Sequence, residues 1–403
     1  MAGITGLGTT FNLPNYHGEL IQLSPTDTPL LSLAGGIGGG KQTTSTSFEW
    51  QTEDLRDPES RPRLEGADAP TAESRVRANV ENVVQIFHEA VSTSYTKQAA
   101  TGQYGTPSSA PFYSADGTPN PVGNEHSHQV MTALATIARD VNYVFWHGVK
   151  VKPTSNATAR ATAGLLSSIT SNVQTKKALV SGASAATDTI TVTHDLVVDD
   201  KVVFTAVGAA TAIKPHRAYW VTAATGTTSF KVSATKGGSA ITIGTATGLA
   251  FYPLKAANTV GVDDINALAQ SAFDNGGISL QDTATLFVPS GQKIQVSKAY
   301  GNAYGKSDAL AGTRNVAGIA VNTIETDFGV LNIVIDRALP ADALAIVSLE
   351  QVDPVFLSIP DKGVLFEEEL AKTGASDRTQ IYGEIGLKYG NEAAHAVARG
   401  FFA

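Results

Sequence analysis

The chain has 403 residues, of which 42% are hydrophobic and 16% are charged, and its formal net charge is −8. This is enough apolar material for a core and, at this length, for more than one domain, which excludes a disordered chain. The acidic balance disfavours a protein that binds nucleic acid by neutralising phosphates, because that needs clustered lysine and arginine. Since cysteine is absent, disulfides, thiolate metal sites and cysteine nucleophiles are excluded.

The sequence contains no stretch that approaches the roughly 20 apolar residues of a membrane helix. Its first residues also lack the basic and apolar segments of a secretory signal. We therefore expect a soluble protein that is made in a cytoplasm and has no membrane partner.

Residues 1–47 are predicted to form an extended arm. Glycine, threonine and proline are scattered through them, and isolated apolar residues such as Phe11 and Leu30 follow no helical period. A segment of this kind does not order by itself. We expect the arm to lie along another subunit.

Residues 45–95 are predicted to form a long two-stranded hairpin, with TSTSFEWQ as one strand and SRVRANVENVVQIFHEAVSTSYT as the other. A polar connection with three prolines joins them, and all of its basic residues are arginine. Charges of alternating sign are equally typical of a solvated loop, but arginine suits bidentate ion pairs, and a hairpin this long exposes strand edges. The residues that we expect to contact other subunits are Arg56, Arg61, Arg63, Arg75, Arg77, Glu53, Asp57 and Glu59.

The strongest helical pattern covers residues 121–147, after a loop rich in glycine, serine and proline. Asn120 can cap this helix, Pro121 suits its first turn, and apolar residues from Val130 to Phe145 recur at spacings of three and four. A helix of this length spans roughly 40 Å. It is therefore predicted to be a structural strut.

Residues 178–254 are predicted to form a small all-β module. Their short alternating strands are DTITVTHD, KVVFTAV, RAYWVTAAT, TSFKVSAT, SAITIG and LAFYPL, separated by glycine-rich turns. Because this pattern differs from the mixed patterns on both sides, we interpret the module as an insertion.

The rest of the chain is predicted to mix helices and strands, which gives an α+β fold class. VDDINALAQSAFDNGG and SGQKIQVSKAYGNAYG are the expected helices, whereas TATLFVP, DFGVLNIVIDRALP and ALAIVSLEQV are expected strands. Strand patterns continue to the end of the chain in VFLSIP, VLFEEEL and the segment that begins at Arg378.

One glycine-rich motif could indicate nucleotide binding. GGIGGGK, at Gly35–Lys41, has the glycine and lysine spacing of a phosphate-binding loop. However, Gln42 stands where Mg²⁺ binding requires serine or threonine, and a strand rather than a helix is expected to follow. A flexible joint between the arm and the hairpin explains this motif better.

No group of residues forms a convincing catalytic or metal site. Glu125, His126 and His128 do not have the spacing that would place both histidines on one helix face. The acidic residues at Asp263, Asp264 and 367–369 suit a helix start and an exposed strand end, and no established catalytic motif occurs in its proper context. We therefore expect a protein that is not an enzyme and that has no cofactor and no metal.

The order of these elements resembles that of the major capsid proteins of tailed bacteriophages, which have the Hong Kong 97-type fold. The similarity covers most of the chain, and GGGKQTTSTSFEWQTEDLR, the helix at 121–147 and TDFGVLNIVIDRALP resemble one branch of these shell proteins. The resemblance implies self-assembly into pentamers and hexamers and then into an icosahedral shell. This shell would enclose double-stranded DNA without binding it specifically, as part of a virion assembled in the host cytoplasm.

The resemblance also implies partners and a division of the chain. Scaffolding, portal and decoration proteins are the further partners that it suggests. The implied parts are an N-terminal arm at 1–47, an extended loop at 48–95, a peripheral domain with a spine helix at 96–157, an axial domain at 158–177 and 255–345, an inserted all-β domain at 178–254, and the return of the peripheral domain at 346–403.

Three other functions remain open from the sequence. An encapsulin-type compartment would have the same fold, but the β insertion and the lack of a cargo-docking pattern count against it. A tail-tube or decoration protein is a further alternative, and the long helix argues against a tail tube, which is mostly β. An enzyme with a β-domain insertion would need a convergent set of catalytic residues, which the sequence does not offer.

Overall fold

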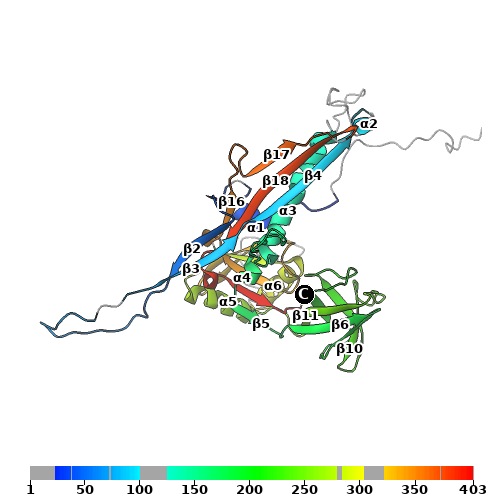
Figure 1. Ribbon diagram of the computed structural model, residues 1–403. Helices are drawn as coiled ribbons and strands as arrows, with labels where there is room; N and C mark the ends of the chain where they lie inside the picture. Colours follow the sequence, from blue (N-terminus) through cyan, green and yellow to red (C-terminus); the bar gives the residue numbers. More distant parts are fainter. Residues whose placement is uncertain are drawn as a thin grey trace, which may run out of the picture.

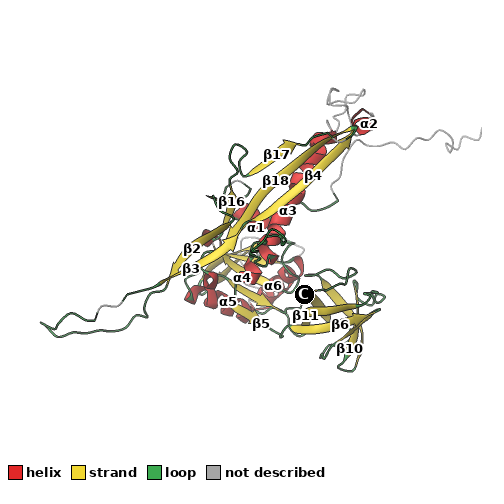
Figure 2. Cartoon of the chain, viewed as in Figure 1, coloured by secondary structure: helices red, strands yellow, loops and turns green. Residues whose placement is uncertain are grey.

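The structure, a computed structural model, describes residues 23–37, 39–71, 74–99, 125–278, 284–303, 322–372 and 374–402. These residues form an elongated lobe, a second lobe built on a six-stranded sheet, a closed β-barrel and a hairpin that projects away from all three (Figure 1). The mixture of helices and strands agrees with the predicted α+β class (Figure 2).

The elongated lobe combines a five-stranded sheet with one long helix. Its strands are β1 (Lys41–Thr43), β16 (Asp353–Leu357), β18 (Ser376–Lys388), β17 (Leu365–Glu369) and β4 (Gln85–Ser94), and its helices are α3 (Glu125–His147) with the short α1 (Pro29–Leu33), α2 (Tyr95–Ala99) and α4 (Leu165–Ser168). The central strand is β18, because β4 pairs with one of its edges and β16 and β17 pair with the other. Segments from both ends of the sequence therefore share one sheet.

The helix α3 forms because its apolar residues make a single stripe. Ile137, Val141 and Phe145 recur every fourth residue, are completely or almost completely buried, and pack in one core with Ile381 and Ile385 of β18. The predicted long helix is thus found from Glu125 onward, whereas its expected cap lies outside the described residues.

The second lobe has a six-stranded sheet that carries two helices. The strand order is β13 (Thr323–Thr326), β14 (Gly329–Ile335), β12 (Ala284–Val288), β15 (Leu344–Ser348), β19 (Ala396–Arg399) and β5 (Val173–Thr175), and the helices are α5 (Val262–Asp274) and α6 (Ser290–Ala303), with single 3₁₀ turns at Leu349–Gln351 and Glu392–Ala394. Every residue of β12 and β15 is buried, as expected for central strands. The helices and strands predicted between residues 262 and 352 are confirmed in type.

The barrel closes on itself around an aromatic core. Its strands are β6 (Val180–Ala186), β7 (Thr189–Thr191), β8 (Lys201–Ala206), β9 (Ala218–Thr225), β10 (Ser229–Ser233) and β11 (Ala246–Leu254), in the closed order β10-β7-β6-β11-β8-β9. The ring of Phe251 packs against those of Phe204 and Phe230, with centroids 5.7 and 5.2 Å apart. A barrel that fills its own interior in this way has a core separate from both lobes.

One predicted strand of the barrel is wrong and another was missed. SAITIG, residues 239–244, is not a strand, because Ile241 and Ile243 make only single main-chain bonds, to the carbonyls of Val232 and Thr187. Apart from Val180, the strand β6 lacks the β-branched and aromatic residues that mark strands. Its small residues fit there because Ala183 and Ala185 face the crowded barrel core.

The hairpin ends earlier than predicted. It consists of β2 (Ser47–Glu53) and β3 (Arg77–Val83), paired from Ser47 with Val83 to Glu53 with Arg77. The expected second strand instead divides at Val84, and the continuation, β4, pairs with β18. Asn82, Val83 and Val84 are buried one after another, which breaks the two-residue alternation of a strand. At these residues the chain passes from one sheet to the other.

Candidate assembly surface

The base of the hairpin is fixed to the elongated lobe. The indole nitrogen of Trp50 donates to the carbonyl of Gly390 at 2.8 Å, and its ring meets the edge of Tyr389. Asn82 is completely buried, and its amide donates to the carbonyls of Ala163 and Leu387 at 3.2 and 2.6 Å. The direction in which the hairpin leaves the body is therefore set by buried hydrogen bonds.

A charged cluster strengthens the same base. The carboxylate of Glu81 accepts hydrogen bonds from Lys152, Ser47 and Lys150, and these contacts lower the pKa of Glu81 to about 2. Lys150 and Lys152 follow α3 in sequence. The cluster thus ties β3 to the segment after the long helix.

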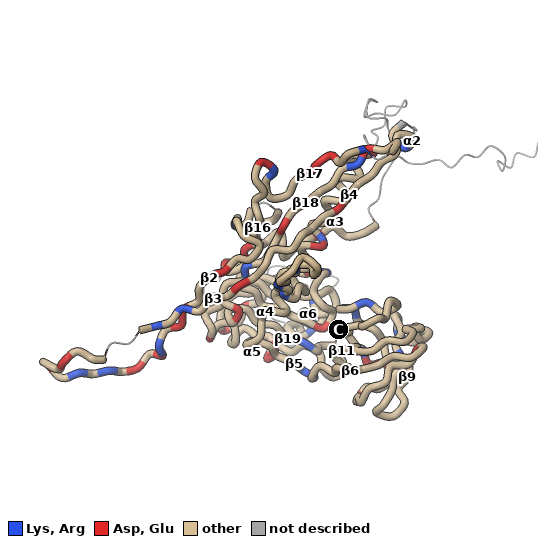
Figure 3. Tube along the Cα trace, viewed as in Figure 1, with Lys and Arg blue, Asp and Glu red and all other residues tan. Residues whose placement is uncertain are grey.

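Beyond the base, every described residue of the connection between β2 and β3 is exposed. We call residues 54–71 and 74–76 the projecting loop; all of them are exposed, and the loop extends away from the body (Figures 1 and 3). Leu55, Leu64 and Val76 are 79, 86 and 87% exposed. Complete burial of such a side chain is worth about 1.5–3 kcal/mol, so a partner that covers the projecting loop would be strongly favoured.

The predicted contact residues all lie on this loop or on the strand ends next to it, where acidic and basic residues alternate (Figure 3). Arg56 pairs with Glu59 at 2.8 Å, and Arg61 pairs with the same carboxylate. The main-chain carbonyl of Asp57 accepts a further bond from Arg56 at 3.1 Å. Exposed pairs of this kind contribute about 0–1 kcal/mol each, so they can exchange partners at little cost.

The remaining predicted residues are equally exposed. Arg77 lies 3.8 Å from Glu53 across the two strands, and Arg63 donates to the carbonyl of Asp68 at 3.4 Å. Arg75 lies in the extended segment before β3. Contact of these side chains with another subunit stays a prediction.

The apolar residues of the projecting loop were not predicted from the sequence. Leu55, Leu64 and Val76 are isolated among charged and proline residues, so no periodicity marks them. The only available signal is the presence of leucine in a segment that is too polar to form a core.

The N-terminal segment rests partly on its own subunit. Leu30 and Leu31 of α1 are buried in the core beside α3, and the N–H of Leu31 donates to the side chain of Asn142 at 3.0 Å. The expectation that the arm lies along another subunit is therefore wrong for α1. The first 22 residues lie outside the described part of the chain.

The glycine-rich motif Gly35–Lys41 leads into a strand. The strand β1 pairs in parallel with β16, and Lys41 forms an ion pair with Asp353 at 2.7 Å. A Cβ atom at Gly40 would overlap the carbonyl oxygen of Pro354, which explains glycine at this position. Close packing of two strands thus accounts for part of the motif.

The histidines near the start of α3 have structural roles. His126 lies between the hydroxyls of Thr93 and Thr379, at 3.0 and 2.8 Å, and connects α3 to β4 and β18. Among the described residues no group of histidine and acidic side chains could hold a metal ion. In the same part of the chain, no helix is long and apolar enough to cross a membrane.

Comparison with solved structures supports the same fold. The capsid chain of cyanophage A-1(L) superposes with a TM-score of 0.55 at 10% identity, over 98% of this chain and 99% of that one. The capsid chain of cyanophage P-SCSP1u gives 0.51 at 9% identity over 96% and 93%, and that of the native GTA particle gives 0.51 at 11% over 99% and 98%. The expected similarity to phage capsid folds is therefore confirmed.

Sequence comparison gives a more specific result. No curated protein sequence matches this chain. The family model of the SU10 major capsid protein, however, matches residues 3–402. Because this match covers nearly the whole chain, the protein belongs to the SU10 major capsid protein family and is a structural capsid protein of a bacteriophage rather than an enzyme.

Proposed function

We propose that the protein assembles with copies of itself into pentamers and hexamers, and that these build an icosahedral shell around a packaged double-stranded DNA genome. Assembly takes place in the host cytoplasm, and the mature protein resides in the virion. The observation that carries this proposal is the projecting loop, which is fully exposed although buried bonds hold its base.

In the proposed shell, the projecting loop lies over a neighbouring subunit. Its leucines lose water there, and its arginines exchange their weak ion pairs for bidentate pairs with the neighbour. Each contact is small, but every subunit makes several at once, and tethered contacts reinforce one another through effective concentration. The net charge of −8 keeps the wall from adhering to the enclosed DNA.

The two lobes and the barrel take separate roles in this proposal. The elongated lobe, with α3 as its spine, is the peripheral domain, and the six-stranded lobe is the axial domain. The barrel is an inserted domain, which is supported by its connections: β6 and β11, its first and last strands, pair with each other, while β5 and α5 on either side belong to the six-stranded lobe. Scaffolding, portal and decoration proteins are the proposed further partners.

Sedimentation and negative-stain electron microscopy of the full chain expressed alone test the proposal. Closed particles, or rings of five and six subunits, are the expected result. A dispersed monomer with an ordered projecting loop would contradict it. Nucleic acid in particles purified from infected cells is also expected, and a protein cargo in its place would favour an encapsulin-type compartment.

A further inference from the structure

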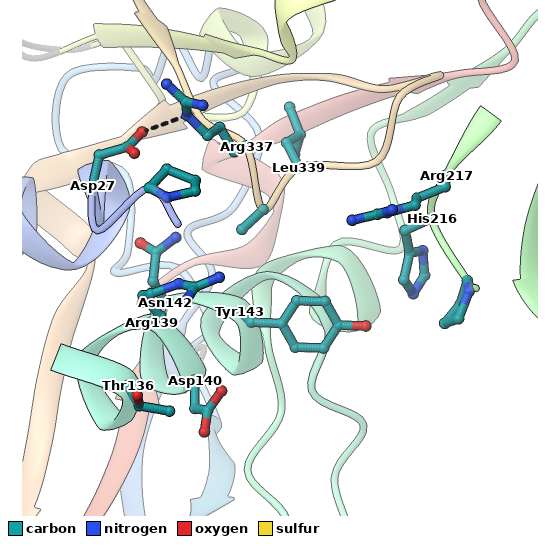
Figure 4. Close-up of a pocket in the computed structure, with 13 residues that line it drawn as sticks. Asp27, Thr136, Arg139, Asp140, Asn142, Tyr143, His216, Arg217, Arg337 and Leu339 are labelled. Atoms are coloured by element: carbon teal, nitrogen blue, oxygen red, sulfur yellow. Dashed lines mark hydrogen bonds and ion pairs between the residues drawn. The ribbon is translucent and has the colours of Figure 1, made fainter. Parts of the chain in front are cut away.

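We propose that a hollow between α3, the barrel and the N-terminal segment binds a small oxyanion, such as a phosphate or a polycarboxylate. The hollow has a volume of about 350 Å³, which lies at the lower end of the range for small-molecule sites (Figure 4). Neither the capsid function nor the family assigns a ligand to this place. The proposal concerns the single subunit and does not depend on assembly.

Arginines from three separate elements line the hollow. Arg139 comes from α3, Arg217 from the loop before β9, and Arg337 from the loop after β14, and Figure 4 shows them around one space. Arg337 already pairs with Asp27, at 3.0 Å. Arg139 and Arg217 form no ion pair with any residue that the structure describes. Asp27 and Asp140 also line the hollow, and Asp140 interacts electrostatically with Arg139. Three arginines thus face two aspartates, and the excess positive charge favours an anion.

A buried network beneath the hollow holds two of these arginines in place. The carboxylate of Asp336 is 1% exposed and accepts bonds from the indole of Trp146 at 2.8 Å, the amide of Asn142 at 3.3 Å and the main-chain N–H of Ala338 at 2.8 Å. Asp336 precedes Arg337 in the chain, and Asn142 lies one turn after the α3 arginine. The network therefore fixes the backbones that present both guanidinium groups.

The third arginine is held by the barrel loop. The N–H of His216 donates to the carbonyl of Phe204 at 2.7 Å, and its own carbonyl accepts from Ala341 at 3.3 Å. The ring of His216 stacks on that of His147, with centroids 3.7 Å apart. At φ +64° this histidine occupies the left-handed region, which persists only where the surroundings enforce it. Arg217, the next residue, is therefore presented from a rigid position.

This arrangement is suited to an oxyanion for two reasons. The planar guanidinium group pairs with phosphate and carboxylate through two parallel hydrogen bonds. The rigid backbones reduce the ordering cost of binding. His216 also lines the hollow, and its buried ring nitrogen Nδ1 has no hydrogen-bond partner in the described part of the chain. A bound anion would connect α3 directly to the barrel.

Isothermal titration of the full-length subunit with sodium pyrophosphate, and separately with citrate, tests the proposal at constant ionic strength. Saturable binding of at least one probe is expected, with at least a tenfold loss of affinity in the double variant Arg139→Gln, Arg217→Gln. Both side chains are exposed, so the variant should keep the unfolding midpoint of the wild type without ligand.

The matched control is Arg63→Gln, which removes an exposed arginine from the distant projecting loop. It should bind the probe as the wild type does. The proposal is overturned if neither probe binds saturably, or if the double variant and the control lose affinity equally.

Discussion

The projecting loop and the network beneath α3 contain similar polar chemistry in opposite surroundings. In the loop, Arg56 and Arg61 share Glu59, and all three residues are exposed to water. Beneath α3, Asp336 and Asn142 are 1 and 2% exposed and make several hydrogen bonds. Exposed pairs contribute about 0–1 kcal/mol, whereas buried groups are costly to leave without partners. The network therefore stabilises the subunit, and the loop is available to stabilise the shell.

The largest effect is expected from Asp336→Ala. This change leaves the indole N–H of Trp146 and the amide of Asn142 buried without their acceptor. The free energy of unfolding should fall by about 3–5 kcal/mol in denaturant titration. The control Asp57→Ala, on the projecting loop, should change it by less than about 0.5 kcal/mol. Similar small losses in both variants would contradict the distinction between the two regions.

A smaller effect is expected at the boundary between the regions. Asn82→Ala removes the buried amide that holds the base of the hairpin to Ala163 and Leu387. We expect a loss of about 2–3 kcal/mol, together with faster amide hydrogen exchange in β3. Unchanged exchange would show that other contacts, such as those of Trp50, are sufficient to hold the base.

Acid should weaken the contact between barrel and body. Burial, together with the neighbouring charges, lowers the pKa of His147 to about 3 and that of His216 to about 4. Between these values and the unfolded value near 6.5, the unfolded chain binds protons that the folded chain does not, so stability falls as the pH drops. From pH 7.5 to 5.5 the expected loss is roughly 1 kcal/mol per histidine.

Denaturant titration at both pH values measures this loss. The variant His216→Asn removes one titrating ring, so it should lose the part of the pH dependence of stability that this ring contributes. Asparagine is chosen because it tolerates the left-handed backbone at this position. A pH dependence equal to that of the wild type would show that the stacked ring is not responsible.

The smallest effect on the subunit is expected from Leu64→Ser. Because this leucine is 86% exposed, the free energy of unfolding should change by less than about 0.5 kcal/mol. The yield of shells, measured by sedimentation, should nevertheless fall. The same substitution at Leu31, which is 2% exposed, should destabilise the subunit itself. A normal shell yield from Leu64→Ser would exclude this leucine from the assembly contact.

The sequence predicted those elements that local pattern specifies. The stripe of Ile137, Val141 and Phe145 predicted α3, and the apolar run in ALAIVSLEQV predicted β15. The division of the strand at Val84 was not predicted, since both halves have good strand composition and only the choice of partner separates them. The docking of α1 on α3 likewise depends on a contact between distant residues, Leu31 and Asn142.

The candidate assembly surface was predicted only in part, because composition marks its charged residues and no pattern marks its apolar ones. The charged residues of the hairpin connection were recognised by composition, and they are exposed in the structure. The exposed Leu55 and Leu64 were missed, because an isolated leucine in a polar segment has no pattern. The network at Asp336 joins residues about 190 positions apart, and no local signal marks such a contact.

Amide hydrogen exchange of the projecting loop in free subunits and in assembled shells tests most directly whether this loop contacts a neighbouring subunit. We expect rapid exchange throughout residues 54–71 in the subunit and strong protection of the same residues in the shell, while β18 is protected in both states. Equal, rapid exchange of the loop in subunit and shell would contradict this contact.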